Sequence, residues 1–241
     1  MRLYSDLAEW YSLITPASEY AEEADHLVRL IDAMRDGPAA AFLELGAGAG
    51  HMASHLKTRF RCTLTDLSPE MLKLSRALNP ECEHRLADMR TLALDRTFDI
   101  VLAHDAICYM TTEADQRSAI ETAARHLRRG GVAIFLPDDV KDTFRNSTTC
   151  GGHDAGDGRG VRYLEWTSDP DPSDTTIVME FALLIREAGK AVRVEHDTHL
   201  LGLFDRATWR RHMRSAGFAV LEPTVFDPYA GQHEVFVGRK M

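Results

Sequence analysis

The chain has 241 residues, of which 44% are hydrophobic and 27% charged, as expected for one globular domain with an elaboration. Its formal net charge of −9 argues against DNA or RNA as a partner, because phosphate contacts need clustered Lys and Arg. A small-molecule partner is therefore favoured.

The first residues and the cysteines indicate the compartment. The stretch MRLYSDLAEWYSLI carries acidic residues among its apolar ones, so neither a signal peptide nor a membrane span is expected. The four cysteines form no CxxC pair, which argues against a zinc site or a disulfide framework. We expect a cytoplasmic protein with reduced thiols, no bound metal and no membrane contact.

The first half of the chain alternates between helix and strand patterns. An amphipathic helix is expected over 19–34, and Ser68 with Pro69 is a typical helix start. Further helices are expected over 49–59 and 113–129, the last ended by Gly130 and Gly131. Buried strands are expected at 42–45, 62–65, 83–87, 98–103 and 132–136. Because this order requires crossovers, it predicts an α/β fold with a doubly wound parallel sheet.

The second half of the chain no longer alternates between helix and strand patterns. Strand-like runs at 161–167, 175–186 and 190–201 have no helix between them, so they predict an antiparallel insertion between the fifth strand and the last helix. A loop is expected over 150–160, which is rich in Gly and Asp. A helix over 205–216 then leads to strands at 218–225 and 234–237, expected to close the sheet edge as a hairpin.

The stretch FLELGAGAGHM places glycines at 46, 48 and 50 directly after a buried strand. No Gly-Lys-Ser/Thr follows, which excludes a Walker loop. Gly48, Gly50 and Ala53 satisfy G-x-G-x-x-A, and Asp66 lies at the distance of a ribose-binding acid. An NAD(P)-dependent oxidoreductase is therefore the alternative from another enzyme class.

Two acids favour a different ligand. Glu44 lies at the end of the strand before the glycines, where it would face a pyrophosphate, and Asp88 follows the third strand. S-adenosylmethionine has a ribose, an adenine amine and a positively charged sulfonium amino acid but no phosphate. Asp66 can accept both ribose hydroxyls and Asp88 the adenine amine, while the three glycines let the backbone approach the ligand.

Five blocks in order, ELGAGAG, TDLSPEML, LADMRTL, FDIVLAHDAICYM and HLRRGGVAIF, resemble the consecutive motifs of class I S-adenosylmethionine-dependent methyltransferases. The resemblance covers about residues 42–136, and the final strand pair fits that family's reversed last strand. It implies a Rossmann-like, seven-stranded, mostly parallel sheet. It also implies a cofactor site lined by Glu44, Gly46, Ala47, Gly48, Asp66, Leu67, Met71, Asp88, Met89 and His104.

A narrower resemblance lies outside this core. YSDLAEWYSLI and VEHDTHLLGLFDRATWRRHMRSAGF are similar to bacterial enzymes that methylate amino groups of nucleotide-linked deoxysugars, and to related small-molecule methyltransferases. It implies methyl transfer to an N or O atom of a small molecule, with an amino sugar as the first candidate. His104 and Asp105 depart from those sugar enzymes, where less polar residues are expected. A non-catalytic, cofactor-binding partner subunit is a further alternative.

The resemblance divides a single domain into four parts. These are an N-terminal helical cap (1–38), a cofactor-binding core (39–137), an antiparallel insertion over the acceptor site (138–203), and the last helix with the closing strand pair (204–241). Tyr4 and Tyr11 are expected on a short N-terminal helix that folds over the cofactor or forms a helix staple.

Catalytic candidates should lie at the carboxyl ends of the strands, where open α/β sheets bind ligands. Methyl transfer needs collinear positioning, and a base where a proton must be removed. We select His104, Asp105 and His199 as catalytic candidates. Packing over adenine is the alternative for His104, and a turn cap is the alternative for Asp105. Tyr109, Asp138, Asp139 and His196 are further candidates at these strand ends.

Three other features have weaker functional interpretations. His196 and Asp197 point to opposite faces of one strand, so they cannot form a simple dyad. Arg210, Arg211 and Arg214 could hold a substrate phosphate or form a solvated helix face. Val178, Ala182 and Leu184 give the inserted sheet a second apolar face, which indicates a possible homodimer.

Overall fold

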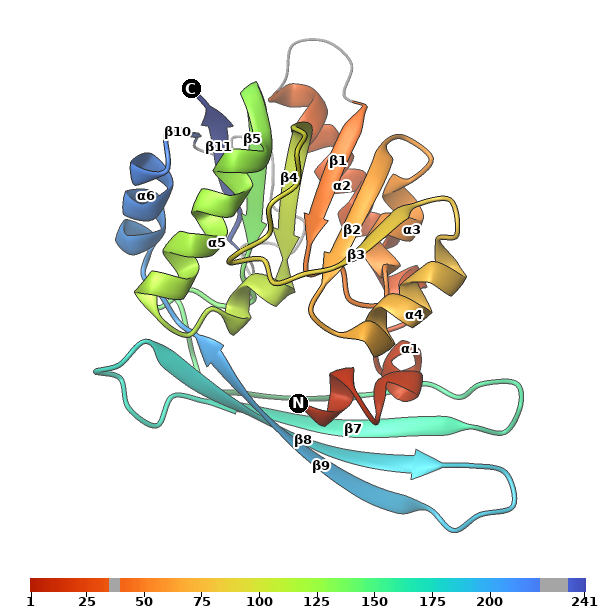
Figure 1. The fold of residues 1–241 in the computed structure, drawn as a ribbon. Helices are drawn as coiled ribbons and strands as arrows, with labels where there is room; N and C mark the ends of the chain where they lie inside the picture. Colours follow the sequence, from red (N-terminus) through yellow and green to blue (C-terminus); the bar gives the residue numbers. More distant parts are fainter. Residues whose placement is uncertain (35–39, 222–233) are drawn as a thin grey trace.

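A computed structural model describes residues 1–34, 40–221 and 234–241. Within these residues a seven-stranded sheet is flanked by helices, and a separate four-stranded antiparallel sheet lies beside it (Figure 1). The larger sheet has the order β10-β11-β5-β4-β1-β2-β3. Its strands are β1 (Ala41–Leu45), β2 (Arg61–Asp66), β3 (Glu83–Leu86), β4 (Phe98–His104), β5 (Leu127–Leu136), β10 (Phe218–Leu221) and β11 (Phe236–Lys240).

The directions of these strands confirm the predicted fold class. β3, β2, β1, β4 and β5 pair in parallel, whereas β11 runs antiparallel to both β5 and β10. The chain therefore has a mostly parallel sheet with a reversed last strand. The predicted strand over 218–225 is described only to Leu221, and its remaining residues and the expected hairpin connection lie outside the described part of the chain.

Helices cover both faces of the large sheet, as its doubly apolar strands require. They are α2 (Ala21–Ala33), α3 (His51–Leu56), α4 (Pro69–Leu78), α5 (Glu113–His126) and α6 (Arg206–Ser215). The predicted start of α4 is confirmed, because Ser68 Oγ accepts a hydrogen bond from Met71 N at 3.1 Å. Asp205 caps α6 in the same way by accepting from Thr208 N at 2.7 Å.

The prediction that a helix continues to Arg129 is wrong. α5 ends at His126, and the backbone turns extended at Leu127, which pairs with Phe98 of β4. Gly130 has a φ of +75° and lies inside β5, where the register with β4 shifts. The glycine pair thus forms an irregularity in a strand and does not end the helix.

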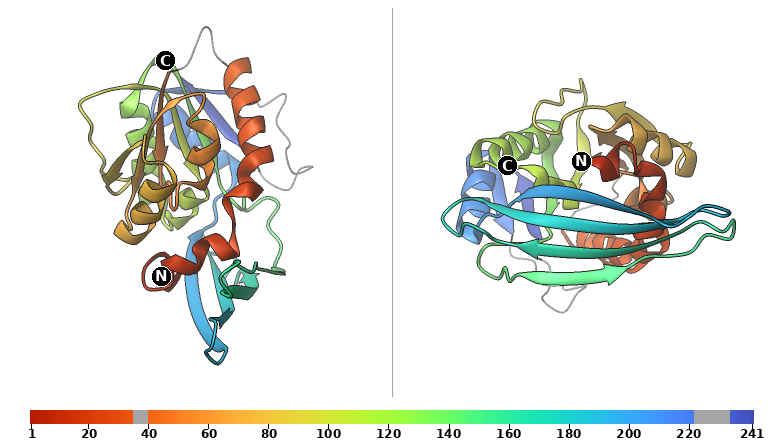
Figure 2. Two further views of the ribbon diagram at one scale, coloured as in Figure 1. Left: turned by 90° about the vertical axis from the view of Figure 1, so that its right-hand side faces the viewer. Right: turned by 90° about the horizontal axis from the view of Figure 1, so that it is seen from below.

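The inserted sheet has one strand more than expected. Its strands are β6 (Ser147–Gly151), β7 (Gly160–Ser168), β8 (Thr176–Arg186) and β9 (Arg193–Gly202). β6 overlaps the predicted loop and has little apolar character, but it pairs with β7 along its length. Figures 1 and 2 show the N-terminal helices between the two sheets. There Leu3, Leu7, Trp10 and Ile14 pack against the inner face of the insertion.

Two further observations bear on the expected compartment. All four cysteines have free thiols. Over residues 1–34, 40–221 and 234–241, the helices are too short or too polar to cross a bilayer.

Gly50 and Gly189 provide a matched test of how the glycine loop packs. Both have a φ of +75°, but a Cβ on Gly50 would lie 2.3 Å from Ser75 Oγ and 2.4 Å from Asn79 Nδ2. A Cβ on Gly189 would meet nothing within 4 Å. We expect Gly189→Ala to lower the free energy of unfolding by about 1 kcal/mol, from backbone strain alone. Gly50→Ala should lose about 2 kcal/mol more, because α4 must move. Urea unfolding measures both, and equal losses would contradict this packing.

Candidate active site

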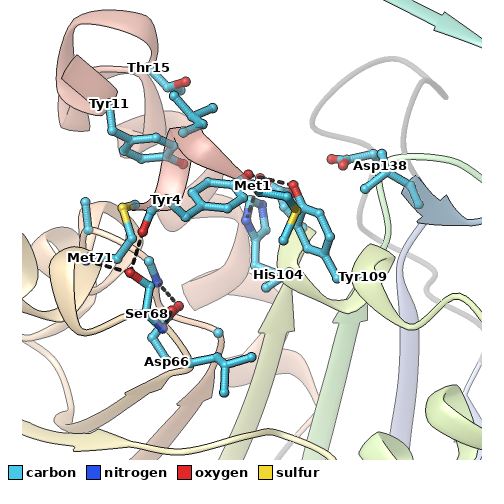
Figure 3. Close-up of a pocket in the computed structure, with 18 of the residues that line it drawn as sticks. Met1, Tyr4, Tyr11, Thr15, Asp66, Ser68, Met71, His104, Tyr109 and Asp138 are labelled. Atoms are coloured by element: carbon cyan, nitrogen blue, oxygen red, sulfur yellow. Dashed lines mark hydrogen bonds and ion pairs between the residues drawn. The ribbon is translucent and has the colours of Figure 1, made fainter. Parts of the chain in front are cut away.

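A cavity of about 1420 Å³ lies between the carboxyl ends of the parallel strands and the inner face of the inserted sheet. Figure 3 shows part of its lining, with Tyr4 and Tyr11 on one side and Asp66 and Ser68 on another. All the residues expected to contact the cofactor line this cavity. They are Tyr11, Glu44, Gly46, Ala47, Gly48, Asp66, Leu67, Met71, Asp88, Met89 and His104. Their roles as ligand contacts stay predictions.

The glycine loop exposes its backbone at one glycine more than at the others. Gly48 has a φ of +53°, and a Cβ there would meet only Met71 Cε, at 3.6 Å, so its surroundings are open to the cavity. A Cβ on Gly46 would lie 2.3 Å from the Cβ of Ala106. Gly46 therefore makes room for the segment after β4, and Gly50 makes room for α4. The expectation that all three glycines admit a ligand is supported at Gly48.

Asp66 organises the loop next to it. Its Oδ2 accepts a hydrogen bond from Gly48 N at 2.7 Å, and its Oδ1 accepts one from Ser68 N at 2.8 Å. The carboxylate has four acceptor positions in all, so acceptor capacity remains for a ligand hydroxyl. Burial raises the pKa of Asp66 above its usual value, against the effect of these backbone donors.

Asp88 already has a cationic partner. Its Oδ2 lies 2.6 Å from Nη2 of Arg90, and Arg90 also contacts Asp115. The hydrogen bonds from Arg90 lower the pKa of Asp88, so this group is a carboxylate near neutral pH. A ligand amine at Asp88 would therefore share the carboxylate with Arg90.

Glu44 is a buried acid without a partner at one of its oxygens. Its residue is 2% exposed, and Oε2 has no hydrogen-bond partner within the described part of the chain. Burial raises the pKa of Glu44 to about 8, and the carboxylate of Asp66 adds to the effect. A cationic or N–H-bearing ligand group would satisfy this oxygen.

Both ring nitrogens of His104 contact carboxylates. Nε2 lies 2.7 Å from Glu23 Oε1, and Nδ1 lies 3.2 Å from Asp105 Oδ2. Burial alone would lower the pKa of His104, but Asp105 and Glu23 raise it well above its usual value. A ring that donates from both nitrogens has no lone pair for a substrate proton. The arrangement favours a charge-holding role for His104 over that of a base.

Further carboxylates line the cavity: Asp105, Asp138, Asp139 and Glu165. Burial and the nearby Asp105 raise the pKa of Asp138 well above its usual value. Burial also raises the pKa of Glu165, which lies on the inner face of β7. We call these four residues the acidic wall. Such a wall attracts cations and repels anions.

Aromatic rings form the side of the cavity nearer the N-terminus. The ring centroids of Tyr4 and Tyr109 are 5.7 Å apart, and those of Tyr4 and Tyr11 are 6.0 Å apart. Tyr11 stacks on His51 at 5.5 Å. Tyr4 lies in a short 3-10 helix (Arg2–Tyr4) and Tyr11 begins α1 (Tyr11–Ile14), so both expected aromatic residues face the site.

His199 is placed differently from the other catalytic candidates. It is 1% exposed and lies behind Tyr109, outside the cavity lining. Tyr109 Oη contacts His199 Nδ1 at 2.8 Å, and His199 Nε2 lies 2.9 Å from Asp197 Oδ2. His196 points to the opposite face of β9, where it pairs with Glu180. The sequence reasoning missed the Asp197–His199 pair, although two residues of spacing on a strand predict a shared face.

Other sequence candidates lie away from the cavity. The arginines of α6 do not line it, and Arg211 pairs with Glu113. Asp154, in the loop expected over 150–160, pairs with Arg162 and Arg186. Within the ranges that the structure describes, no three His, Cys, Asp or Glu side chains are grouped as metal ligands are.

The sequence and the structure are both similar to those of known proteins. Residues 43–135 match the family of methyltransferase domains. The chain is 28% identical to dTDP-3-amino-3,4,6-trideoxy-alpha-D-glucopyranose N,N-dimethyltransferase of Streptomyces venezuelae, over 89% of this chain and 91% of that protein. Streptomyces venezuelae DesVI has a similar structure, with a TM-score of 0.86 and 27% identity over 98% of this chain and 99% of that one. A second is CalS10 with bound S-adenosylmethionine, an amino pentose methyltransferase from Micromonospora echinaspora, with a TM-score of 0.76 and 26% identity over 92% of both chains.

The buried Glu44 predicts a pH dependence of stability in the protein alone. Its pKa rises from 4.5 to about 8 on folding, so the folded state keeps a proton that the unfolded state loses above pH 4.5. The stability of the wild type should therefore fall between pH 4.5 and pH 8, with a contribution of roughly 3–5 kcal/mol from this group. Glu44→Gln carries no charge and should remove this contribution.

The measurement is urea unfolding of both proteins across this range, compared as their difference at each pH so that other titrating groups cancel. Parallel curves for the two proteins would show that Glu44 ionises normally in the fold.

Proposed function

The chain belongs to the class I S-adenosylmethionine-dependent methyltransferases, and we propose that it transfers the methyl group to the amino nitrogen of an amino sugar. When bound, S-adenosylmethionine supplies a methyl group on a sulfonium, which an acceptor lone pair takes by in-line displacement. The protein's part is to hold both partners in line, to exclude water and to manage the acceptor proton.

The residues at the strand ends fit this cofactor. The open backbone at Gly48 lets a ligand approach closely, and Asp66 keeps acceptor capacity for a ribose hydroxyl. The unsatisfied Oε2 of Glu44 fits the ammonium of the amino-acid part. We propose that these residues hold the cofactor, together with Tyr11, Gly46, Ala47, Leu67, Met71, Asp88, Met89 and His104.

The acidic wall is the observation that carries the choice of an amine. It lies beside the proposed cofactor residues and concentrates carboxylates where the acceptor must enter. An ammonium group would bind there with favourable charge, and the rings of Tyr4 and Tyr109 add cation–π attraction. A sugar hydroxyl gains nothing comparable from these carboxylates. The relatives named above act on amino sugars, which supports the same choice.

The comparisons do not favour the two alternatives that the sequence left open. The family and the relatives are methyltransferases, so an NAD(P)-dependent oxidoreductase and a non-catalytic partner subunit have no support of their own. We further propose that residues 138–203 form the cover of the acceptor site, that the protein works in the cytoplasm, and that it does not bind nucleic acid. The negative charge and free thiols support the last two proposals.

A homodimer through the outer face of the insertion is also proposed. Figure 2 shows this face uncovered when the molecule is seen from below. Its alternate side chains include large apolar groups that are about half exposed or more, at Leu164, Trp166, Leu184 and Val194. A patch of this kind on a stable sheet favours self-association.

Asp66→Ala should weaken binding of S-adenosylmethionine about a hundredfold or more. The variant removes the carboxylate for the ribose and also frees the backbone of Gly48 and Ser68. Isothermal titration with S-adenosylmethionine, S-adenosylhomocysteine and NADH measures this, with silence from NADH expected throughout. Mass spectrometry of amino sugars incubated with the wild type should show added methyl groups on nitrogen.

Asp95→Ala is the control for this experiment, since Asp95 is exposed and lies outside the cavity. It should bind and turn over as the wild type does. Methylation of hydroxyls with no reaction at amines would overturn the proposed acceptor, whereas binding of NADH alone would overturn the cofactor.

Trp166→Glu should convert the proposed dimer to a monomer, because a charge would be buried within the apolar patch. Light scattering during size-exclusion chromatography at micromolar concentration measures the mass. Leu86→Glu is the matched control, because Leu86 is 60% exposed at the edge of the other sheet. A monomeric wild type rejects the dimer.

A further inference from the structure

Four polar side chains from three separate parts of the chain form one continuous line of hydrogen bonds. Tyr4 Oη and Tyr109 Oη are 2.7 Å apart, and Tyr109 Oη lies 2.8 Å from His199 Nδ1. His199 Nε2 lies 2.9 Å from Asp197 Oδ2, which also accepts from Leu3 N at 2.7 Å. We call Tyr4, Tyr109, His199 and Asp197 the relay.

The carboxylate at its end sets the direction of every bond in the relay. Burial opposes ionisation of Asp197, but the bonds from Leu3 N–H and His199 keep its pKa below the usual value. An ionised carboxylate only accepts, so His199 carries its proton on Nε2. Burial lowers the pKa of His199, so the ring is neutral and its Nδ1 is a bare acceptor. Tyr109 must therefore donate its O–H to His199.

The hydrogen bond between Tyr4 and Tyr109 also has a fixed direction. Because the single proton of Tyr109 is used on His199, the contact with Tyr4 requires Tyr4 to donate to Tyr109. Both phenol oxygens then present a lone pair without a proton. Tyr4 and Tyr109 line the cavity, while His199 and Asp197 are buried behind them. The relay thus offers the cavity an acceptor, backed by a base that no ligand touches.

The open end of the relay lies next to the proposed cofactor residues. The backbone carbonyl of Tyr4 accepts a hydrogen bond from Ser68 Oγ at 2.5 Å, and the Tyr4 side chain packs with Ala49 and Met71. Figure 3 shows Tyr4 between Met71 and Tyr109. The tyrosine end of the relay therefore lies beside the proposed cofactor residue Met71.

An acceptor amine enters mostly as ammonium at neutral pH and has no lone pair until a proton leaves. His104 donates from both nitrogens to carboxylates, so its ring has no lone pair for another proton. The relay has a neutral imidazole with a free acceptor nitrogen, held at one remove from the cavity.

Resting on the proposed function, we propose that the relay removes the ammonium proton of the acceptor through Tyr109. The substrate N–H bond breaks and its electron pair stays on nitrogen as the attacking lone pair. Its proton forms an O–H bond on Tyr109 as the original Tyr109 O–H proton moves to His199 Nδ1. The imidazolium is stabilised by Asp197. Tyr109 is the residue that contacts the acceptor, and His199 and Asp197 act through it as positioning residues.

The charged groups around the relay come from several elements. His199 experiences Asp197 on its own strand, Glu180 on β8 and the amino group of Met1. Tyr109 experiences Asp138 and the neighbouring tyrosines Tyr4 and Tyr11. Phe181 adds an apolar contact to His199, with ring centroids 5.1 Å apart. The carboxylates favour the imidazolium once it forms, so the proton transfer costs less than it would to an isolated buried ring.

The test is a pH profile of turnover for His199→Asn and Tyr109→Phe. The probe is dTDP-3-amino-3,4,6-trideoxy-α-D-glucopyranose, the acceptor for which the Streptomyces venezuelae relative is named. The amide introduced by His199→Asn can still accept from Tyr109 but cannot take a proton, so kcat should fall about a hundredfold or more while S-adenosylmethionine binding is unchanged. The deficit should shrink about tenfold per pH unit as solution base frees the amine.

A purely structural latch would give a deficit that does not change with pH, and this result would overturn the relay. Tyr109→Phe removes one oxygen and serves if His199→Asn does not fold. It should show the same recovery at high pH. His196→Asn is the matched control, because His196 is 65% exposed on the opposite face of the same strand. It should match the wild type at every pH.

A spectroscopic measurement separates failure of the relay from failure of the proposed function. Nitrogen-15 NMR of the wild type at neutral pH should show His199 neutral, with a proton on Nε2 and none on Nδ1. A proton on Nδ1, or an imidazolium, would overturn the relay whatever the acceptor is. A wild type that methylates no amino sugar, but shows the expected ring, would overturn the proposed acceptor and leave the hydrogen-bond assignment standing.

Discussion

The site depends on one packing constraint, the placement of the N-terminal segment between the two sheets. Leu3 and Trp10 are each 2% exposed and pack on the inner face of the insertion. Burial of such side chains contributes about 1.5–3 kcal/mol each, which is enough to hold a short segment that has little helix of its own. Tyr4 and Tyr11, on the same segment, are thereby placed against the strand ends. Without this packing the cavity would lose Tyr4 and Tyr11 from its lining.

The electrostatics of the cavity follow from bringing strand ends and the insertion together. Each acid alone is an ordinary surface group, but burial and mutual repulsion raise the pKa of Glu44 and Asp138. Such a site can be neutralised by protons or by a cationic ligand. The proposed sulfonium cofactor and ammonium acceptor would do the latter, so their binding would relieve the charge repulsion that the fold creates. The charge repulsion within the site and its selectivity for cations have the same origin.

The elements that depend on local sequence patterns were predicted correctly. The mainly apolar strands at 42–45 and 98–103 and the start of α4 at Ser68 depend on neighbouring residues, and the structure has them. Two failures came from tertiary pairing. Leu127 leaves the helix because Phe98 pairs with it, and β6 is a strand only because β7 lies beside it. The cofactor candidates follow strand ends within one motif series, so all of them could be placed at the cavity.

Contacts across the fold could not be predicted in the same way. Glu23 reaches His104 over 81 residues, and no local pattern marks it. His199 was selected because its segment resembles the sugar enzymes, and its position behind Tyr109 is known only from the structure. The period of two along a strand, however, separates His196 from Asp197 and also unites Asp197 with His199, so that pair was open to prediction. Contacts within one strand can be predicted from the sequence, whereas contacts between different elements cannot.

The proposed cofactor contacts and the proposed acceptor contacts lie on different segments of the chain. The proposed cofactor contacts lie mostly between Glu44 and His104, on loops anchored to one parallel sheet. The proposed acceptor side is assembled from Tyr4, Tyr109, Glu165 and the buried His199, which come from separate segments. Substitutions in the insertion can therefore change the acceptor side without disturbing the glycine loop. Because Asp197 binds both Leu3 N–H and His199, the cover of the site and its proton acceptor are coupled through one carboxylate. A change that loosens the N-terminal segment must also alter the base, which ties closure of the cavity to its chemistry.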